Sequence, residues 1–122
     1  MKKAEIQFSE EQMTIFDGSN IQKFNYHDII GIFCDYPYIK IETTTDPKSK
    51  LIFHSLKEIG QLLPSLFIMC NRSSIINIMY INQMKYEVNQ SFLCLNNGRQ
   101  IRIPRRKKST IIKKNHAFLR GK

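Results

Sequence analysis

The sequence has 122 residues, of which 42% are hydrophobic and 11% aromatic, and its formal net charge is +9. This length fits one domain with enough apolar content to bury a core, so a wholly disordered chain is not expected. No run approaches the roughly 18 apolar residues of a membrane-spanning helix, and the opening MKKAEIQFSEE has acids where a secretory signal is apolar. We therefore expect a cytoplasmic protein with no membrane partner.

The cysteines and histidines do not indicate a metal site or a catalytic centre. Cys34, Cys70 and Cys94 are odd in number and lie inside apolar runs, which favours buried free thiols over a disulfide framework. Together with the three histidines they show no spacing typical of a zinc site. His27 and Asp28 are neighbours at a predicted strand, where adjacent side chains point to opposite faces. We expect neither a cofactor nor enzyme activity.

The positive charge is concentrated near the C-terminus. Residues 1–87 hold 9 Lys or Arg and all 10 acids, a balance of −1, whereas residues 88–122 hold 10 Lys or Arg and no acid, a balance of +10. Such a block is either a solubilising tail or a surface that contacts a polyanion. We favour the polyanion contact, because solvated surfaces usually mix charges of both signs.

The N-terminal half is predicted to form short strands joined by tight turns. The predicted strands are 13–16, 21–25, 28–34, 38–45 and 51–54. Residues 17–20, Asp-Gly-Ser-Asn, are typical of a hairpin turn. Residues 35–37 form a short loop, because Pro37 does not continue a strand, and Asp46 with Pro47 predicts a further turn.

A single short helix is predicted at 55–63. Ser55 and Glu58 have the S-x-x-E spacing of a capping box, and Pro64 closes the segment. The apolar residues that recur at helical spacing are Leu56, Ile59, Leu62 and Leu63.

The C-terminal half returns to strands. The predicted strands are 67–70, 74–77, 80–88, 92–95 and 99–103. Asn97 and Gly98 are the strongest hairpin signal in the chain. Pro104 is placed to open a basic helix over 105–115. The fold expected is mainly β: an elongated arrangement of short antiparallel sheets with one short helix and a basic C-terminal helix.

Four segments in this order resemble the LytTR DNA-binding domain of bacterial transcription regulators, over about residues 5 to 115. These segments are DIIGIFCDYPYIKIET at 28–43, SLKEIGQLLPSLF at 55–67, FIMCNRSSIIN at 67–77 and NNGRQIRIPRR at 96–106. The central motif departs from the family's pattern, with Met69, Asn71 and Arg72 where Arg, His and Arg are usual. Pro104 likewise replaces a serine. These departures leave open which bases are read.

The resemblance implies that loops between strands enter successive major grooves of duplex DNA. It assigns Asp35 and Tyr36, with Pro37, to a first loop. Asn71, Arg72 and Ser73 form a central loop, where Arg suits guanine and Asn suits adenine. Arg105 would be a third base contact, and Arg106, Lys107 and Lys108 would bind phosphates. Asn77 is expected instead to order the backbone of its own turn.

The resemblance also implies a stand-alone DNA-binding domain at 1–115, without a receiver, followed by a basic tail at 116–122. A homodimer on repeated sites and a separate signalling partner stay open. One alternative is a basic β-domain that binds RNA or single-stranded nucleic acid, with Tyr80, Tyr86 and Phe92 as stacking platforms. Another is a protein-interaction module whose basic segment docks an acidic partner.

Overall fold

The computed structural model describes residues 2–45 and 49–120, the side chains of 117–120 excepted. The strands form three antiparallel sheets, as the sequence predicts. The first sheet has the order β1-β2-β3, from Glu5–Phe8, Gln12–Asp17 and Asn20–Asn25. Gly18, at φ +63°, lies in the β2–β3 turn and confirms the predicted hairpin.

The second sheet occupies the centre of the chain and has five strands. Their order is β6-β5-β4-β8-β7, from Lys50–Phe53, Tyr38–Thr43, Ile29–Asp35, Ser74–Asn77 and Phe67–Asn71. Helix α1, Leu56–Leu62, lies between β6 and β7 in the chain. Its N-cap is Ser55, whose Oγ accepts a hydrogen bond from the Glu58 amide at 3.4 Å, so the predicted helix start is confirmed. Asp46 and Pro47 lie outside the described residues.

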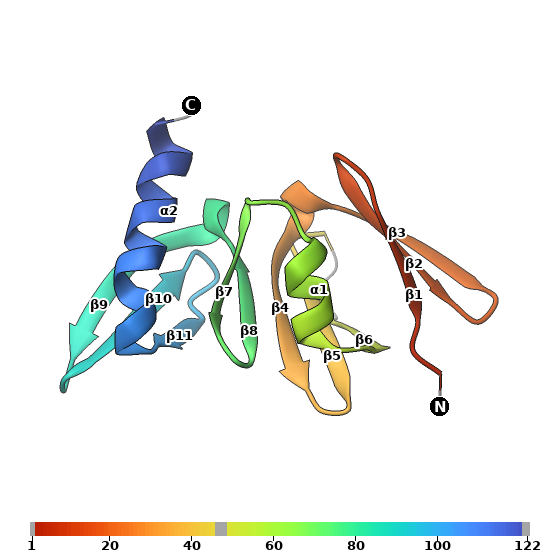
Figure 1. Cartoon of the computed structure of the whole chain (residues 1–122), viewed down its shortest axis with the longest axis horizontal. Coiled ribbons are helices and arrows are strands. Elements are labelled where there is room, and N and C mark those ends of the chain that lie inside the picture. The colour runs from red at the N-terminus through yellow and green to blue at the C-terminus, as the bar shows by residue number, and fades with distance from the viewer. Residues whose placement is uncertain (1, 46–48, 121–122) are drawn as a thin grey trace.

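The third sheet and the last helix complete the fold. The sheet order is β11-β10-β9, from Gln100–Ile103, Gln90–Leu95 and Ile81–Glu87. Gly98, at φ +90°, turns β10 into β11 where the hairpin is predicted. A 3₁₀ turn at Arg105–Lys107 leads into helix α2, Lys108–Arg120. The three sheets lie in a row along the long axis, with α2 against the third sheet (Figure 1).

The structure has a strand that the sequence analysis does not predict, β1 at Glu5–Phe8, and the bounds of later elements also differ. The strand expected at 80–88 begins at Ile81, because Ile78–Tyr80 forms a 3₁₀ turn. It ends at Glu87, because Val88 and Asn89 adopt positive φ and turn the chain into β10. The last helix begins at Lys108 rather than beside Pro104, and it continues past residue 115. The division at 115/116 therefore stays a prediction.

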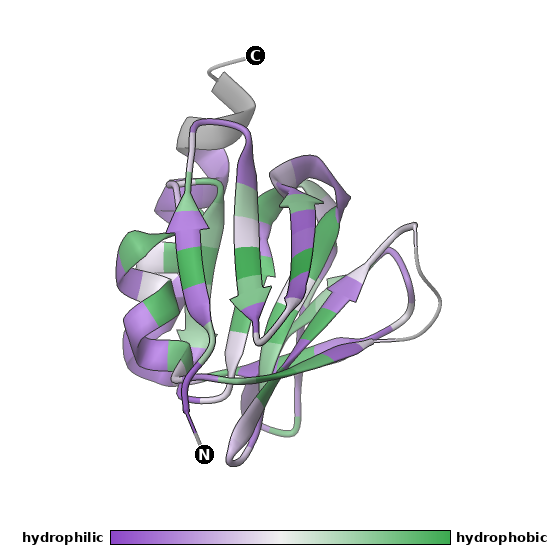
Figure 2. Ribbon diagram, turned by 90° about the vertical axis from the view of Figure 1, so that its right-hand side faces the viewer, coloured by the Kyte–Doolittle hydropathy of each residue, from purple (hydrophilic) through white to green (hydrophobic). Residues whose placement is uncertain are grey.

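Strands β4, β7 and β8 of the central sheet are largely buried on both faces, which accounts for their nearly continuous apolar runs. Neighbouring residues of one strand point to opposite faces. Ile32 and Ile75 join a core shared with the first sheet and α1. Phe33 and Ile76 join a second core shared with the third sheet and α2. Figure 2 shows hydrophobic bands along the strands and hydrophilic residues at the turns.

Asn77 holds the junction between the two cores. Its side chain is fully buried, and its Nδ2 donates to the carbonyls of Tyr26 and Ile29 at 3.0 and 2.9 Å. Its Oδ1 accepts from the Met79 amide at 2.9 Å and so opens the 3₁₀ turn after β8. The expectation that Asn77 orders the backbone is confirmed.

We expect Asn77→Ala to lower the free energy of unfolding by about 2 to 4 kcal/mol, because buried main-chain groups lose their hydrogen-bond partner. Urea unfolding followed by circular dichroism measures this loss. Asn82→Ala, an exposed asparagine of β9, is the control and should change stability by less than about 0.5 kcal/mol. Equal effects of the two variants would contradict the assigned role of Asn77.

Candidate nucleic-acid interface

The three segments predicted to contact DNA lie along one edge of the molecule. Figure 1 shows the β4–β5 turn, the β7–β8 turn and the start of α2 along the lower edge of the view. The first two are joined directly, because the Cys34 amide donates to the Ser73 carbonyl at 2.9 Å. The third is joined to the second by Lys107, whose Nζ donates to the Met69 carbonyl at 3.2 Å. Segments far apart in sequence thus form one surface.

The first turn presents an exposed aromatic side chain. Asp35 pairs with Tyr38 across the β4–β5 turn, and Tyr36 with Pro37 forms its tip around a cis peptide bond. The Tyr36 side chain is 90% exposed, so it is not packed on its own loop. An exposed tyrosine of this kind can stack or donate a hydrogen bond to a ligand.

The central turn presents an exposed arginine. Arg72 and Ser73 are exposed at the β7–β8 turn. Within the described part of the chain, the Arg72 guanidinium makes no hydrogen bond or ion pair. Asn71 differs, because its carboxamide bonds to the Ser73 amide and to the Arg102 carbonyl. Among the described residues, Arg72 and Ser73 are therefore the neighbours whose side-chain polar groups remain available.

The third segment mixes available and engaged cations. Arg105 and Arg106 are exposed in the 3₁₀ turn before α2. Lys107 is half-buried and bonded to Met69. Lys108 places its Nζ 5.1 Å from the centre of the Tyr86 ring, a cation–π contact. The predicted phosphate contacts of Lys107 and Lys108 stay predictions, and both lysines have a structural contact as well.

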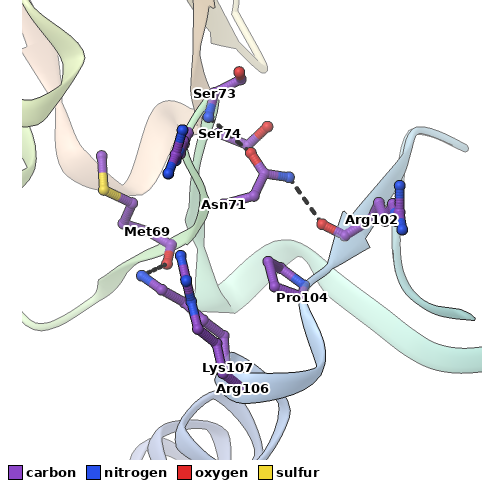
Figure 3. Close-up of a pocket in the computed structure, with 9 residues that line it drawn as sticks. Met69, Asn71, Ser73, Ser74, Arg102, Pro104, Arg106 and Lys107 are labelled. Carbon is purple, nitrogen blue, oxygen red and sulfur yellow. Dashed lines mark hydrogen bonds between the residues drawn. The ribbon is translucent and has the colours of Figure 1, made fainter.

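A hollow of about 480 Å³ separates the central turn from the third segment. Figure 3 shows Met69, Asn71 and Ser73 on one side and Pro104, Arg106 and Lys107 on the other. All of its charged lining groups are cations: Arg72, Arg102, Arg106 and Lys107. A concave surface with this lining suits an anionic ligand.

The sequence prediction missed Arg102. This residue lines both the first hollow and a second one, of about 410 Å³, that also contains Arg105 and Lys108. Ile101 and Ile103 on either side are buried while Arg102 is exposed, so strand alternation predicts its outward position. That alternation is the sequence signal that could have identified it.

Arg99 lies apart from this surface. Its Nη1 is 2.7 Å from Oε2 of Glu42, and its guanidinium carbon is 3.7 Å from the centre of the Phe33 ring. Arg99 therefore joins the third sheet to the central one. Its charge is largely compensated and contributes little to binding an anion.

Two kinds of feature are absent from the described part of the chain. No three His, Cys, Asp or Glu side chains there are grouped to hold a metal ion. No helix in the same part is long and apolar enough to cross a membrane.

A match to a known domain family identifies the family to which this chain belongs. The model of the LytTr DNA-binding domain matches residues 19–115, most of the chain. The chain belongs to the LytTR DNA-binding domain family. This is a family of DNA-binding domains and not of enzymes, and the match includes all four segments that carry the sequence resemblance.

A solved LytTR structure has the same fold. It is the LytTr DNA-binding domain of a putative methyl-accepting/DNA response regulator from Bacillus cereus, with 19% sequence identity and a TM-score of 0.69. The alignment covers 87% of this chain and 97% of that one. At this identity the likeness shows the fold. A comparison with curated protein sequences found no match.

The thiols provide a test of how this edge of the LytTR domain is packed. Burial raises the pKa of Cys70, directly before Asn71, to about 12, whereas Cys34 is exposed. A thiolate is the reactive form, so Cys70 should stay unmodified by a thiol reagent at pH 8 and gain reactivity as pH rises toward 12. One thiol per native chain should react rapidly, and Cys34→Ser should remove it. Rapid modification of Cys70 at pH 8 would contradict this packing.

Proposed function

We propose that this LytTR domain binds double-stranded DNA sequence-specifically and acts in transcription regulation. The observation that carries the proposal is the exposed Arg72 at the tip of the β7–β8 turn, which has no partner among the described residues. This turn lies between an exposed aromatic turn and an arginine-rich segment. Family membership supports DNA as the ligand.

The central turn has the form and chemistry for base recognition. The major groove of B-DNA, about 12 Å wide, is broad enough to admit a turn such as the one between β7 and β8. The Arg72 guanidinium can donate two hydrogen bonds to O6 and N7 of guanine, the commonest specific contact. Tyr36 and Arg105 flank it on the same edge and would contact neighbouring positions.

Other cations would supply affinity without sequence information. Arg102 and Arg106 line the hollow between the central turn and the third segment, where a backbone phosphate fits the charge. Lys113 and Lys114 are exposed on α2 and can reach further phosphates. Each phosphate neutralised releases about one counterion, which makes binding depend on salt.

Binding of single-stranded nucleic acid is supported less well. Of the three candidate stacking residues, Tyr86 is 63% exposed, but its ring already contacts Lys108. Tyr80 donates its hydroxyl hydrogen bond to the His27 carbonyl, and Phe92 is only partly exposed. These aromatic residues do not form an open row on which successive bases could stack.

Binding to duplex DNA should weaken steeply with salt. We expect log K to fall against log salt concentration with a slope of about −4 to −8, given the number of cations along this edge. Fluorescence anisotropy with a labelled duplex, repeated at salt concentrations from about 50 to about 300 mM, measures this slope. A slope near zero would rule out binding dominated by phosphates.

Arg72→Ala should cost about 1 to 3 kcal/mol on the preferred duplex and relax selectivity at one base pair. The preferred duplex is first selected from random DNA, and each position is then varied in competition assays. The double variant Lys113→Ala and Lys114→Ala is the control, and should reduce the salt slope by about 2 while base preference is kept. If Arg72→Ala weakened every duplex equally, Arg72 would be a phosphate contact.

A further inference from the structure

The carboxamide of Asn71 connects two parts of the proposed interface. Its Nδ2 donates to the main-chain carbonyl of Arg102 on β11 at 2.8 Å, across 31 positions of sequence. Its Oδ1 accepts from the Ser73 amide at 2.8 Å and closes the β7–β8 turn. Both ends of the group are therefore occupied within the protein (Figure 3).

We propose that Asn71 is a positioning residue that fixes the spacing between the Arg72 and Arg105 contacts, and that it does not read a base. The proposal rests on the DNA-binding function proposed above. Each end of the carboxamide makes one bond, which leaves one N–H and one oxygen lone pair, and the two bonds fix the direction in which these point. If the side chain turned to pair with adenine, these bonds would break, and the Arg102 carbonyl and the Ser73 amide would need new partners. The position of the carboxamide favours the positioning role.

The link from Arg102 to Arg105 is short and stiff. Ile103 is buried in the second core, and Pro104 has its φ fixed by the ring. A bond at the Arg102 carbonyl therefore also limits where Arg105 can lie. At the other end, the Asn71 bond to Ser73 sets the shape of the turn that carries Arg72. A single side chain thus constrains both arginines.

The second core packs β7 against β11, but the other hydrogen bonds near these exposed segments do not replace this one. The Lys107 contact with the Met69 carbonyl is longer, at 3.2 Å, and comes from a flexible side chain. The Cys34 amide bond to Ser73 holds the first turn to the central one and does not reach β11. Without the Asn71 carboxamide, the turn with Arg72 and the segment with Arg105 would move more independently.

The variant Asn71→Ala tests the proposal with Asn97→Ala as a matched control. Asn97 makes the same bond to an amide two residues on, Arg99, at 3.0 Å, but its side chain makes no bond to another segment within the described residues. The probes are the duplex selected by the wild-type protein, duplexes with one base pair changed at the Arg72 or the Arg105 position, and a duplex with one base pair inserted between them. Variants Arg72→Ala and Arg105→Ala locate the two positions.

Wild type and Asn97→Ala should each lose about tenfold or more in affinity on the inserted duplex and on each changed duplex. In Asn71→Ala these penalties should fall together to about threefold, because the two contacts adjust separately. Loss of discrimination at one further base pair, with the insertion penalty retained, would make Asn71 a base reader and overturn the proposal. Unchanged penalties would also overturn it. General misfolding would lower the affinity for every duplex by the same factor, so it could not by itself produce the expected fall in the penalties.

An experiment without DNA separates this inference from the function on which it rests. Amide hydrogen exchange measured by NMR should be about tenfold faster at Ser73 in Asn71→Ala than in wild type. An unchanged rate would show that the carboxamide does not hold the turn. If wild type preferred no duplex while this rate rose, the proposed function would fail and the structural link would stand.

Discussion

The buried carboxamide of Asn77 is the interaction on which the arrangement of the molecule depends. It satisfies three main-chain groups, two of them through buried hydrogen bonds, and these groups belong to the entry into β4 and the turn after β8. The contact keeps β4 and β8 side by side, and this pairing brings the first and central turns to the same edge. It also directs the chain out of the central sheet toward the third one. A polar residue in the interior therefore sets the positions of the exposed residues.

The candidate interface is built from turns, yet main-chain and side-chain bonds join these turns across the sequence. The first turn is joined to the second by Cys34, and the second to the third segment by Asn71 and Lys107. Binding through such a surface requires little ordering of the protein, and less conformational entropy is then lost on association. The arginines available at its surface, Arg72, Arg105 and Arg106, are carried by short turns held in this way.

Local sequence signals predicted the elements whose structure depends on neighbouring residues. The turns at Gly18 and Gly98 and the cap at Ser55 follow from conformational preferences within a few positions, and the structure confirms them. The end of β9 was placed one residue too late, because Val88 is a β-branched residue at positive φ, which its own preferences disfavour. The bond from Asn71 to Arg102 was missed for another reason. Its partner is distant in sequence, and only the docking of β11 beside β7 brings the two together.

The central sheet gives opposite faces of the same strands to two different cores. Ile32 with Ile75 faces the first sheet, while Phe33 with Ile76 faces the third. If either core unfolded, one face of these shared strands would be exposed to water, and the other core, which contains their opposite face, would be destabilised. Although the chain is extended into three sheets, its halves are coupled through this shared layer, and it should melt as one cooperative unit rather than in stages. A destabilising change near the N-terminal hairpin would then also destabilise the distant helix α2.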